Sequence, residues 1–464
     1  MADPRIAADL LIAGATLITM DGARRVIVDG ALAIVGDRIV AVGKREAVVR
    51  NVTARRTLEG GRFVITPGFV DGHIHITGDP LTRGFARGGR EVDPGERLQR
   101  WVIPIFRAQS PEDEALAAQC AALAMMRGGT TTFLEAGTIS HLEAVMEALG
   151  PTGIRGRLGE WVEGRAYDPA ADPAEVSAAA VAQLEREVAR YPGADGERLA
   201  AWPVLVGHST NSDAVWRAAK ALADAHGLGV SAHMSPRASD PEWFMKHYGR
   251  RPIEHLADIG VLGPNVCLTH LANIDAAELE ILAASGANAV LCPHAALAGG
   301  FGLARIGLYP EMAARGVNVM LGTDGVAADI LGAARLMALL FRDARADEHL
   351  YPPAAILEMA TLNGARALGM GEAIGSLEVG KAADFVLHDT DTPAWGTVFD
   401  PVAQLALDAP TGAVHSVWID GVQVIDAGRP TLIDEEKLLA EARAAGAALI
   451  ARTGLPTLTQ WAVQ

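Results

Sequence analysis

The chain has few cysteines, few aromatic residues and fewer bases than acids. Three cysteines in 464 residues exclude a disulfide framework and a zinc site built from thiolates. The 40 lysine and arginine residues are outnumbered by 56 aspartate and glutamate residues, and the formal net charge is −16. Because no basic run occurs, we expect a small-molecule substrate and no nucleic-acid partner.

Long apolar runs are also missing. No segment reaches the ~18 consecutive apolar residues of a membrane span, and the first residues lack the pattern of a secretory signal. Together with the low cysteine content, these features predict a cytoplasmic protein that does not interact with membranes.

The length suits an α/β barrel with a smaller domain beside it. Residues 1–66 read as short strands, with Gly36-Asp37 at a hairpin turn, and residues 67–375 alternate apolar strands with Ala-rich helices. We therefore predict an α/β fold: a distorted (β/α)8 TIM barrel over 67–375, a small composite β-sandwich from 1–66 and 376–432, and a helical tail over 433–464.

Histidines and an aspartate follow several of the predicted strands. The stretch from Pro67 to His75 reads PGFVDGHIH, and in an extended segment the i and i+2 side chains, here His73 and His75, point to one face. His233, His270 and Asp324 each end another apolar run. Because the carboxyl ends of barrel strands meet at one mouth, we expect these five side chains to converge there. Any one of them could be explained by core packing, but the whole set could not.

Six motifs make the chain resemble the amidohydrolase superfamily, and most closely its triazine-hydrolase and aminohydrolase branch. They are PGFVDGHIH at 67–75, GGTTT at 128–132, RPIEHL at 251–256, LGTDG at 321–325, TLNGARALG at 361–369 and GSLEVGKAAD at 375–384. The resemblance implies that His73, His75, His233 and Asp324 hold one divalent metal, and that His270 and Asp324 help to activate its water. It also implies a homo-oligomer.

The chemistry of these residues agrees with that ligand set. Three neutral imidazoles and one carboxylate suit Zn²⁺ or Fe²⁺ and leave room for water. Zinc is the expected metal, with iron, cobalt and manganese as alternatives. A carboxylate beside the metal can carry a proton, and His270 can hydrogen-bond the oxyanion formed on attack.

The chain departs from the superfamily pattern at two places. Binuclear members have a carboxylated lysine on a middle strand, and no lysine here ends a strand before His233, which favours one metal. Deaminases of the branch have glutamate three residues after the third ligand, where this chain has Pro236. Their Cys-Pro-X-Ser-Asn stretch is Cys292-Pro-His294-Ala-Ala here.

The missing acid decides our functional prediction. Ring deamination needs a proton donor, whereas a carbonyl oxygen can be polarised by the metal alone. We therefore expect hydrolysis of the carbonyl C–N or C–S bond of a small apolar urea, carbamate or thiocarbamate. The phenylurea hydrolases and the thiocarbamate (molinate) hydrolase, which act on herbicides, look most similar in lacking the acid.

Two alternatives stay open. One is an aminohydrolase, deaminase or dechlorinase that acts on a heteroaromatic ring (a triazine, pterin or purine), with Glu135 or Glu160 as the acid. The other is a relative without activity that keeps the metal site for assembly. The candidate substrate-binding residues, for which core or rim positions are an equally open reading, are Trp161, His208, Trp243, Phe244 and His294.

Overall fold

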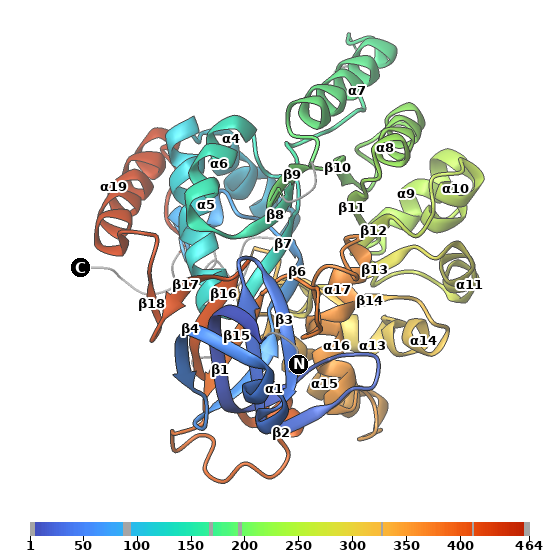
Figure 1. Cartoon of the computed structure of the whole chain (residues 1–464). Coiled ribbons are helices and arrows are strands. Elements are labelled where there is room, and N and C mark those ends of the chain that lie inside the picture. The colour runs from blue at the N-terminus through green and yellow to red at the C-terminus, as the bar shows by residue number, and fades with distance from the viewer. Residues whose placement is uncertain are drawn as a thin grey trace.

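The computed structural model describes residues 5–86, 94–166, 170–193, 197–325, 328–410 and 413–458. The fold is mixed α/β. Strands from both ends of the chain lie together on one side, and the middle of the chain alternates strands with helices (Figure 1).

A nine-stranded sheet joins the two chain ends. Its strands follow the order β18-β17-β16-β15-β5-β1-β2-β3, and β4 pairs with β1. The N-terminal strands are β1 (Ile6–Ile18), β2 (Val26–Val35), β3 (Arg38–Lys44), β4 (Val52–Glu59) and β5 (Phe63–Pro67). The C-terminal strands are β15 (Phe385–Asp389), β16 (Val414–Ile419), β17 (Val422–Asp426) and β18 (Arg429–Pro430). The turn at Gly36-Asp37 connects the antiparallel strands β2 and β3, as the sequence predicts.

The contact between the chain ends is the pairing of β5 with β15. The two strands are antiparallel, with Ile65 opposite Leu387. Both residues belong to one buried cluster with Ile12 and Phe385, whose ring stacks on Trp418 at 4.8 Å. The first and last strands therefore share a core as well as a sheet.

Two parallel sheets occupy the middle of the chain. One contains β6 (Phe69–Ile74), β7 (Thr130–Glu135), β8 (Arg155–Leu158) and β9 (Leu199–Ala201). The other contains β10 (Val204–Gly207), β11 (Val230–Met234), β12 (Val266–His270), β13 (Asn288–Leu291) and β14 (Val319–Leu321). Their residues are almost all buried, as in a parallel sheet covered by helices.

Backbone hydrogen bonds link these two sheets at both ends. After β14, the Asp324 N–H donates to the carbonyl of His73 at 2.8 Å. At the other end, the N–H of Val206, on β10, donates to the carbonyl of Val162, which follows β8, at 3.2 Å. The first strand of one sheet therefore lies beside the last strand of the other.

The longer helices lie outside the parallel strands. They are α5 (Pro111–Arg127), α6 (Leu142–Leu149), α7 (Pro173–Arg190), α8 (Asp213–His226), α9 (Ser239–Tyr248), α10 (Pro252–Asp258), α11 (Ala276–Ser285), α15 (Ile330–Arg345), α16 (Pro353–Ala360) and α19 (Glu435–Thr453). Shorter ones are α1 (Arg45–Asn51), α2 (Asp79–Thr82), α3 (Pro94–Arg97), α4 (Ile103–Arg107), α12 (Pro293–Ala298), α13 (Leu303–Ile306), α14 (Tyr309–Ala314), α17 (Leu362–Ala367) and α18 (Pro401–Ala403). Helix α19 packs on α2 and α5, and it lies beside α5 in Figure 1.

A buried ion network joins the parallel strands to the nine-stranded sheet. The Arg155 guanidinium, at the start of β8, lies 3.1 Å from Asp384 and 2.6 Å from Asp420. Arg155 and Asp384 are both almost fully buried. Removing one partner of such a network leaves an uncompensated charge, which costs about 3–5 kcal/mol.

None of the helices in the described ranges combines the length and the apolar character that crossing a lipid bilayer requires.

Candidate active site

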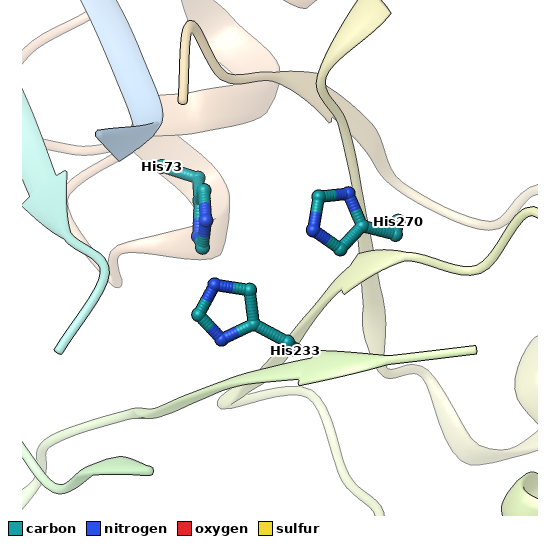
Figure 2. A group of neighbouring side chains, drawn as sticks. All are labelled: His73, His233 and His270. Carbon is teal, nitrogen blue, oxygen red and sulfur yellow. The ribbon is translucent and has the colours of Figure 1, made fainter. Parts of the chain in front are cut away.

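The polar residues predicted at the strand ends form one cluster. The ring of His73 lies 4.6 Å from that of His233, 5.2 Å from that of His75 and 5.8 Å from that of His270, measured between centroids. Figure 2 shows His73, His233 and His270 arriving from three separate strands and facing one another. The predicted convergence is therefore observed.

A side chain from β12 orients His73. Its Nδ1 lies 3.0 Å from the hydroxyl oxygen of Thr269 on β12. Its Nε2 is buried and has no hydrogen-bond partner among the described residues. A buried nitrogen without a partner is costly, and a metal ion at this point would complete it.

His233 has the same arrangement. Its Nδ1 lies 2.9 Å from the carbonyl oxygen of Val206 on β10, which leaves Nε2 for a ligand. Burial, and then the neighbouring imidazoles, hold the pKa of His233 well below its ordinary value; burial does the same for the pKa of His73. Both rings are therefore neutral, the form that binds a metal.

His75 and Asp324 form a close pair. The Nε2 of His75 lies 3.4 Å from Oδ1 of Asp324. Burial disfavours a charge on either group, but their mutual attraction is stronger, so the pKa of His75 is raised and the pKa of Asp324 is lowered well below its usual range. Asp324 is therefore a carboxylate at neutral pH.

His270 lies close to the proposed metal ligands, although the resemblance did not imply that it is a ligand itself. Its Nε2 lies 3.8 Å from Oδ2 of Asp324, and ligand nitrogens of His73, His233 and His270 lie within 4.8 Å of one another. Burial lowers the pKa of His270 to about 4. His270 has a left-handed φ of 82°, and its carbonyl accepts a hydrogen bond from the Tyr309 hydroxyl. Such strained backbone concentrates at functional sites.

Asp71 and Cys292 complete the cluster, and we did not predict a role for either residue. Asp71 accepts hydrogen bonds from the backbone of His73 at 3.2 Å and of Thr323 at 3.0 Å, so it ties β6 to the turn that carries Asp324. The Cys292 thiol lies with ligand atoms of His73 and Asp324 in a group spanning at most 4.8 Å. Asp71 lies within the PGFVDGHIH motif, which could have indicated its role.

His208 lies beside the cluster. Its ring is 5.5 Å from that of His233, and its Nδ1 lies 2.9 Å from Oδ2 of Asp240. The same oxygen of Asp240 accepts the Ser235 N–H at 2.7 Å. Asp240 therefore fixes His208 against the turn that follows His233. We predicted a position at the mouth for His208 but had no expectation for Asp240.

The aromatic candidates lie in different environments. Trp243 is enclosed by the Arg165 guanidinium at 4.0 Å and the His247 ring at 4.0 Å. Phe244 is buried in the hydrophobic core against Tyr248. We therefore leave Phe244 out of the candidate substrate site.

Trp161 and His294 remain candidates. Trp161 follows β8, at the carboxyl end of the sheet, and its indole N–H is buried without an acceptor among the described residues. His294 lies in the first turn of α12, directly after β13, and its Nδ1 is likewise buried without a partner.

The two glutamates considered as replacement acids are occupied elsewhere. Glu135 accepts hydrogen bonds from Gly137 and from the backbone and hydroxyl of Thr138, the latter at 2.8 Å. Glu160 accepts the Leu142 N–H at 3.0 Å, at the start of α6. Both carboxylates hold local backbone, so neither is available as a proton donor in this arrangement.

The residues present fit a single divalent ion. The neutral imidazoles of His73 and His233 and the ionised carboxylate of Asp324 are donors that suit zinc and related metals, and Nε2 of His73 is buried without a partner among the described residues. His73, His75, His233 and Asp324 would hold the ion, with His270 at its edge.

Comparison with known proteins identifies a family and several relatives of the chain. Residues 64–424 match the Amidohydrolase family. The chain is 32% identical over 458 residues to 5-methylthioadenosine/S-adenosylhomocysteine deaminase of Syntrophobacter fumaroxidans, covering 97% of this chain and 99% of that protein.

Two solved structures have the same fold. An adenosine deaminase from Xanthomonas campestris with bound zinc is 26% identical, with a TM-score of 0.86 and coverage of 97% and 100% of the two chains. The atrazine chlorohydrolase of Arthrobacter aurescens TC1, complexed with zinc, is 24% identical, with a TM-score of 0.83 and coverage of 94% and 100%.

These relatives contradict our main functional prediction. They include deaminases of adenine nucleosides, so the expected hydrolysis of a urea, carbamate or thiocarbamate is wrong, and the alternative, ring deamination, fits better. The error came from treating Pro236 as proof that no acid is available. The resemblance to the superfamily, by contrast, is confirmed.

Three findings point to the same family. They are the family match over residues 64–424, the relatives that cover nearly the whole chain, and the cluster of histidines at the strand ends. The chain belongs to the amidohydrolase family and is an enzyme that acts on carbon–nitrogen bonds other than peptide bonds.

Proposed function

We propose that the chain is a zinc-dependent deaminase that removes the exocyclic amino group of the adenine ring in a nucleoside. The observation that carries the proposal is the 32% identity to a 5-methylthioadenosine/S-adenosylhomocysteine deaminase over 97% of this chain. The histidine–aspartate cluster supports it, because every side chain needed to hold one metal is present.

The bound ion would supply a Lewis acid that makes water nucleophilic at neutral pH. Overall, the oxygen of water replaces the amino group, and the two protons of water end on the departing ammonia and on a ring nitrogen. Asp324, an ionised carboxylate in contact with His75, accepts and carries one of these protons. His270 hydrogen-bonds the oxygen that adds to the ring.

The chain also needs a partner for the ring nitrogen, since Pro236 cannot serve. We assign this contact to His208. Its Nδ1 faces Asp240 at 2.9 Å, so its Nε2 is the atom left for the substrate. Asp240 lies seven residues after His233, in the first turn of α9, and provides a carboxylate close to the loop that carries Pro236.

The test is ammonia release by the zinc-loaded protein from 5-methylthioadenosine, 5′-deoxyadenosine and adenosine, with the corresponding hypoxanthine product identified by mass. A His73→Ala variant is the control for catalysis by contaminating deaminases. Absence of ammonia from all three nucleosides, with zinc bound, would contradict the proposal.

We also infer that the two parallel sheets form one closed (β/α)8 barrel over residues 67–375. The hydrogen bonds from Asp324 to His73 and from Val206 to Val162 support closure at both junctions, with β9 and β10 as two parts of one interrupted strand. The ranges 1–66 and 376–432 would form the flanking β-domain, and 433–464 the helical tail. A homo-oligomer remains the expected assembly, measured by light scattering.

A further inference from the structure

Arg237 crosses the mouth of the site. It follows β11, and its Nη2 donates to the carbonyl of Gly299, after β13, at 2.9 Å. Strand β12, which ends at His270, lies between those two strands. The Arg237 side chain therefore passes over the end of the strand that carries His270.

An aromatic ring separates Arg237 from His270. The Arg237 guanidinium lies 4.8 Å from the centre of the Phe301 ring, and that ring meets the ring of His270 edge-on at 5.3 Å. A substrate ring bound at the histidine cluster would therefore lie next to Phe301, and Arg237 would lie on the other side of the Phe301 ring.

Among the residues that the structure describes, the Arg237 guanidinium has no anionic partner. In the described parts of the chain, its hydrogen-bond acceptor is the Gly299 carbonyl, and no carboxylate oxygen lies within 4.0 Å of its nitrogens. The residue is half-buried in a protein with a net charge of −16. A guanidinium has five N–H donors in a planar fork that matches a carboxylate or phosphate, and an aromatic face beneath it strengthens that recognition.

We propose that Arg237, supported by Phe301, forms a subsite that binds an anionic group, a carboxylate or a phosphate, at the far end of the substrate. This inference rests on the proposed function and narrows its substrate class to adenine derivatives with an anionic tail. S-Adenosylhomocysteine carries a carboxylate at its amino-acid end, whereas 5-methylthioadenosine ends in a neutral methyl group, so Arg237 favours the former.

The loop contact of Arg237 gives a competing explanation, in which it only holds the 299–301 segment in place. The two roles differ in their effect on neutral substrates. A subsite for an anion affects only the anionic substrate, chiefly through KM. If Arg237 only holds the 299–301 segment in place, its substitution affects the turnover of both substrates alike.

The experiment compares S-adenosylhomocysteine with 5-methylthioadenosine in the zinc-loaded wild type and in Arg237→Gln, Arg237→Lys and Arg315→Gln. Arg315 forms an exposed ion pair with Glu280 on the outer helices, so its substitution controls for the loss of one positive charge. We expect Arg237→Gln to lower kcat/KM for S-adenosylhomocysteine by ~10- to 100-fold, as for a lost hydrogen bond between charged groups. Turnover of 5-methylthioadenosine should change less than about threefold, with Arg237→Lys intermediate.

Equal losses on both substrates, or no loss on either, would overturn the subsite. The proposed function fails separately, if wild type deaminates neither nucleoside. In that case the same proteins are titrated calorimetrically with both ligands. Weaker binding of S-adenosylhomocysteine alone in Arg237→Gln supports the subsite, and unchanged or undetectable binding overturns it.

Discussion

The Nε2 atom of His75 lies 3.4 Å from Oδ1 of Asp324, although the two residues are far apart in sequence. Each stabilises the charged form of the other, which raises the pKa of the histidine and lowers that of the aspartate against the effect of burial. The contact therefore joins His75, the second histidine of the PGFVDGHIH motif, to Asp324, the residue that we propose carries a proton.

Asp324→Asn should therefore lose both zinc and activity. The amide cannot carry the negative charge or accept a proton, so we expect kcat to fall by about 10²- to 10⁴-fold. Zinc content by atomic absorption and initial rates measure the two effects. Asp258→Asn, at an exposed ion pair with Arg250, is the matched control. Wild-type zinc content and rate in Asp324→Asn would remove the residue from the site.

His270→Ala should keep the metal and lose most turnover. We place His270 at the edge of the metal site as a hydrogen-bond donor to the reacting oxygen, a contribution of about 10²- to 10³-fold in kcat. Because its nitrogen lies close to those of His73 and His233, zinc content is the discriminating measurement. Loss of zinc would make His270 a ligand, and equal activity to wild type would exclude it from the mechanism.

Asp240→Asn should lower kcat through His208. The amide can turn its NH₂ group toward the Nδ1 of His208 and disturb the orientation that the 2.9 Å contact fixes. We expect a loss of about 10- to 100-fold, a similar loss in His208→Asn, and little further loss in the double variant, because the two residues act as a unit. Additive losses in a double-mutant cycle would show that they act independently.

Arg155→Met should destabilise the fold without changing the chemistry. It leaves Asp384 buried next to Asp420 without a cation, at a cost of about 3–5 kcal/mol. The midpoint of urea unfolding measures this, and KM should not change. Arg190→Met, at an exposed ion pair with Glu143, should shift the midpoint far less.

His388 should make the protein less stable in acid. Burial lowers the pKa of His388 to about 3, from 6.5. Between those values the unfolded chain binds a proton that the folded chain does not, so stability is complete above pH ~6.5 and falls as the pH drops, by about 1.4 kcal/mol per unit. In His388→Gln this slope should be smaller. Parallel stability curves for the two proteins between pH 4 and 6.5 would contradict the assignment.

Residues at the ends of apolar strands could be predicted from the sequence, because strand periodicity and barrel topology place His73, His233 and His270 together. Contacts between side chains of different loops and helices could not be predicted in this way. The pairing of His208 with Asp240 joins the turn after β10 to the first turn of α9, 32 positions later, and no local pattern indicates it.

The same limit explains the wrong functional prediction. The absence of glutamate at Pro236 is plain in the sequence, but whether another side chain reaches the same space depends on how the loop after β11 folds back. Asp240 returns to that loop and bonds the Ser235 backbone. A missing motif residue therefore excludes an activity only when the surrounding geometry is known.

Strand β5 pairs with β15 along its whole length, so one edge of β5 is covered only by a segment near residue 385. During synthesis on the ribosome, β5 has an open edge until some 320 further residues have emerged, as the residue numbers of the pairing show. Nascent chains that stop early would expose that edge to other chains, which makes prematurely terminated fragments candidates for aggregation and chaperone capture.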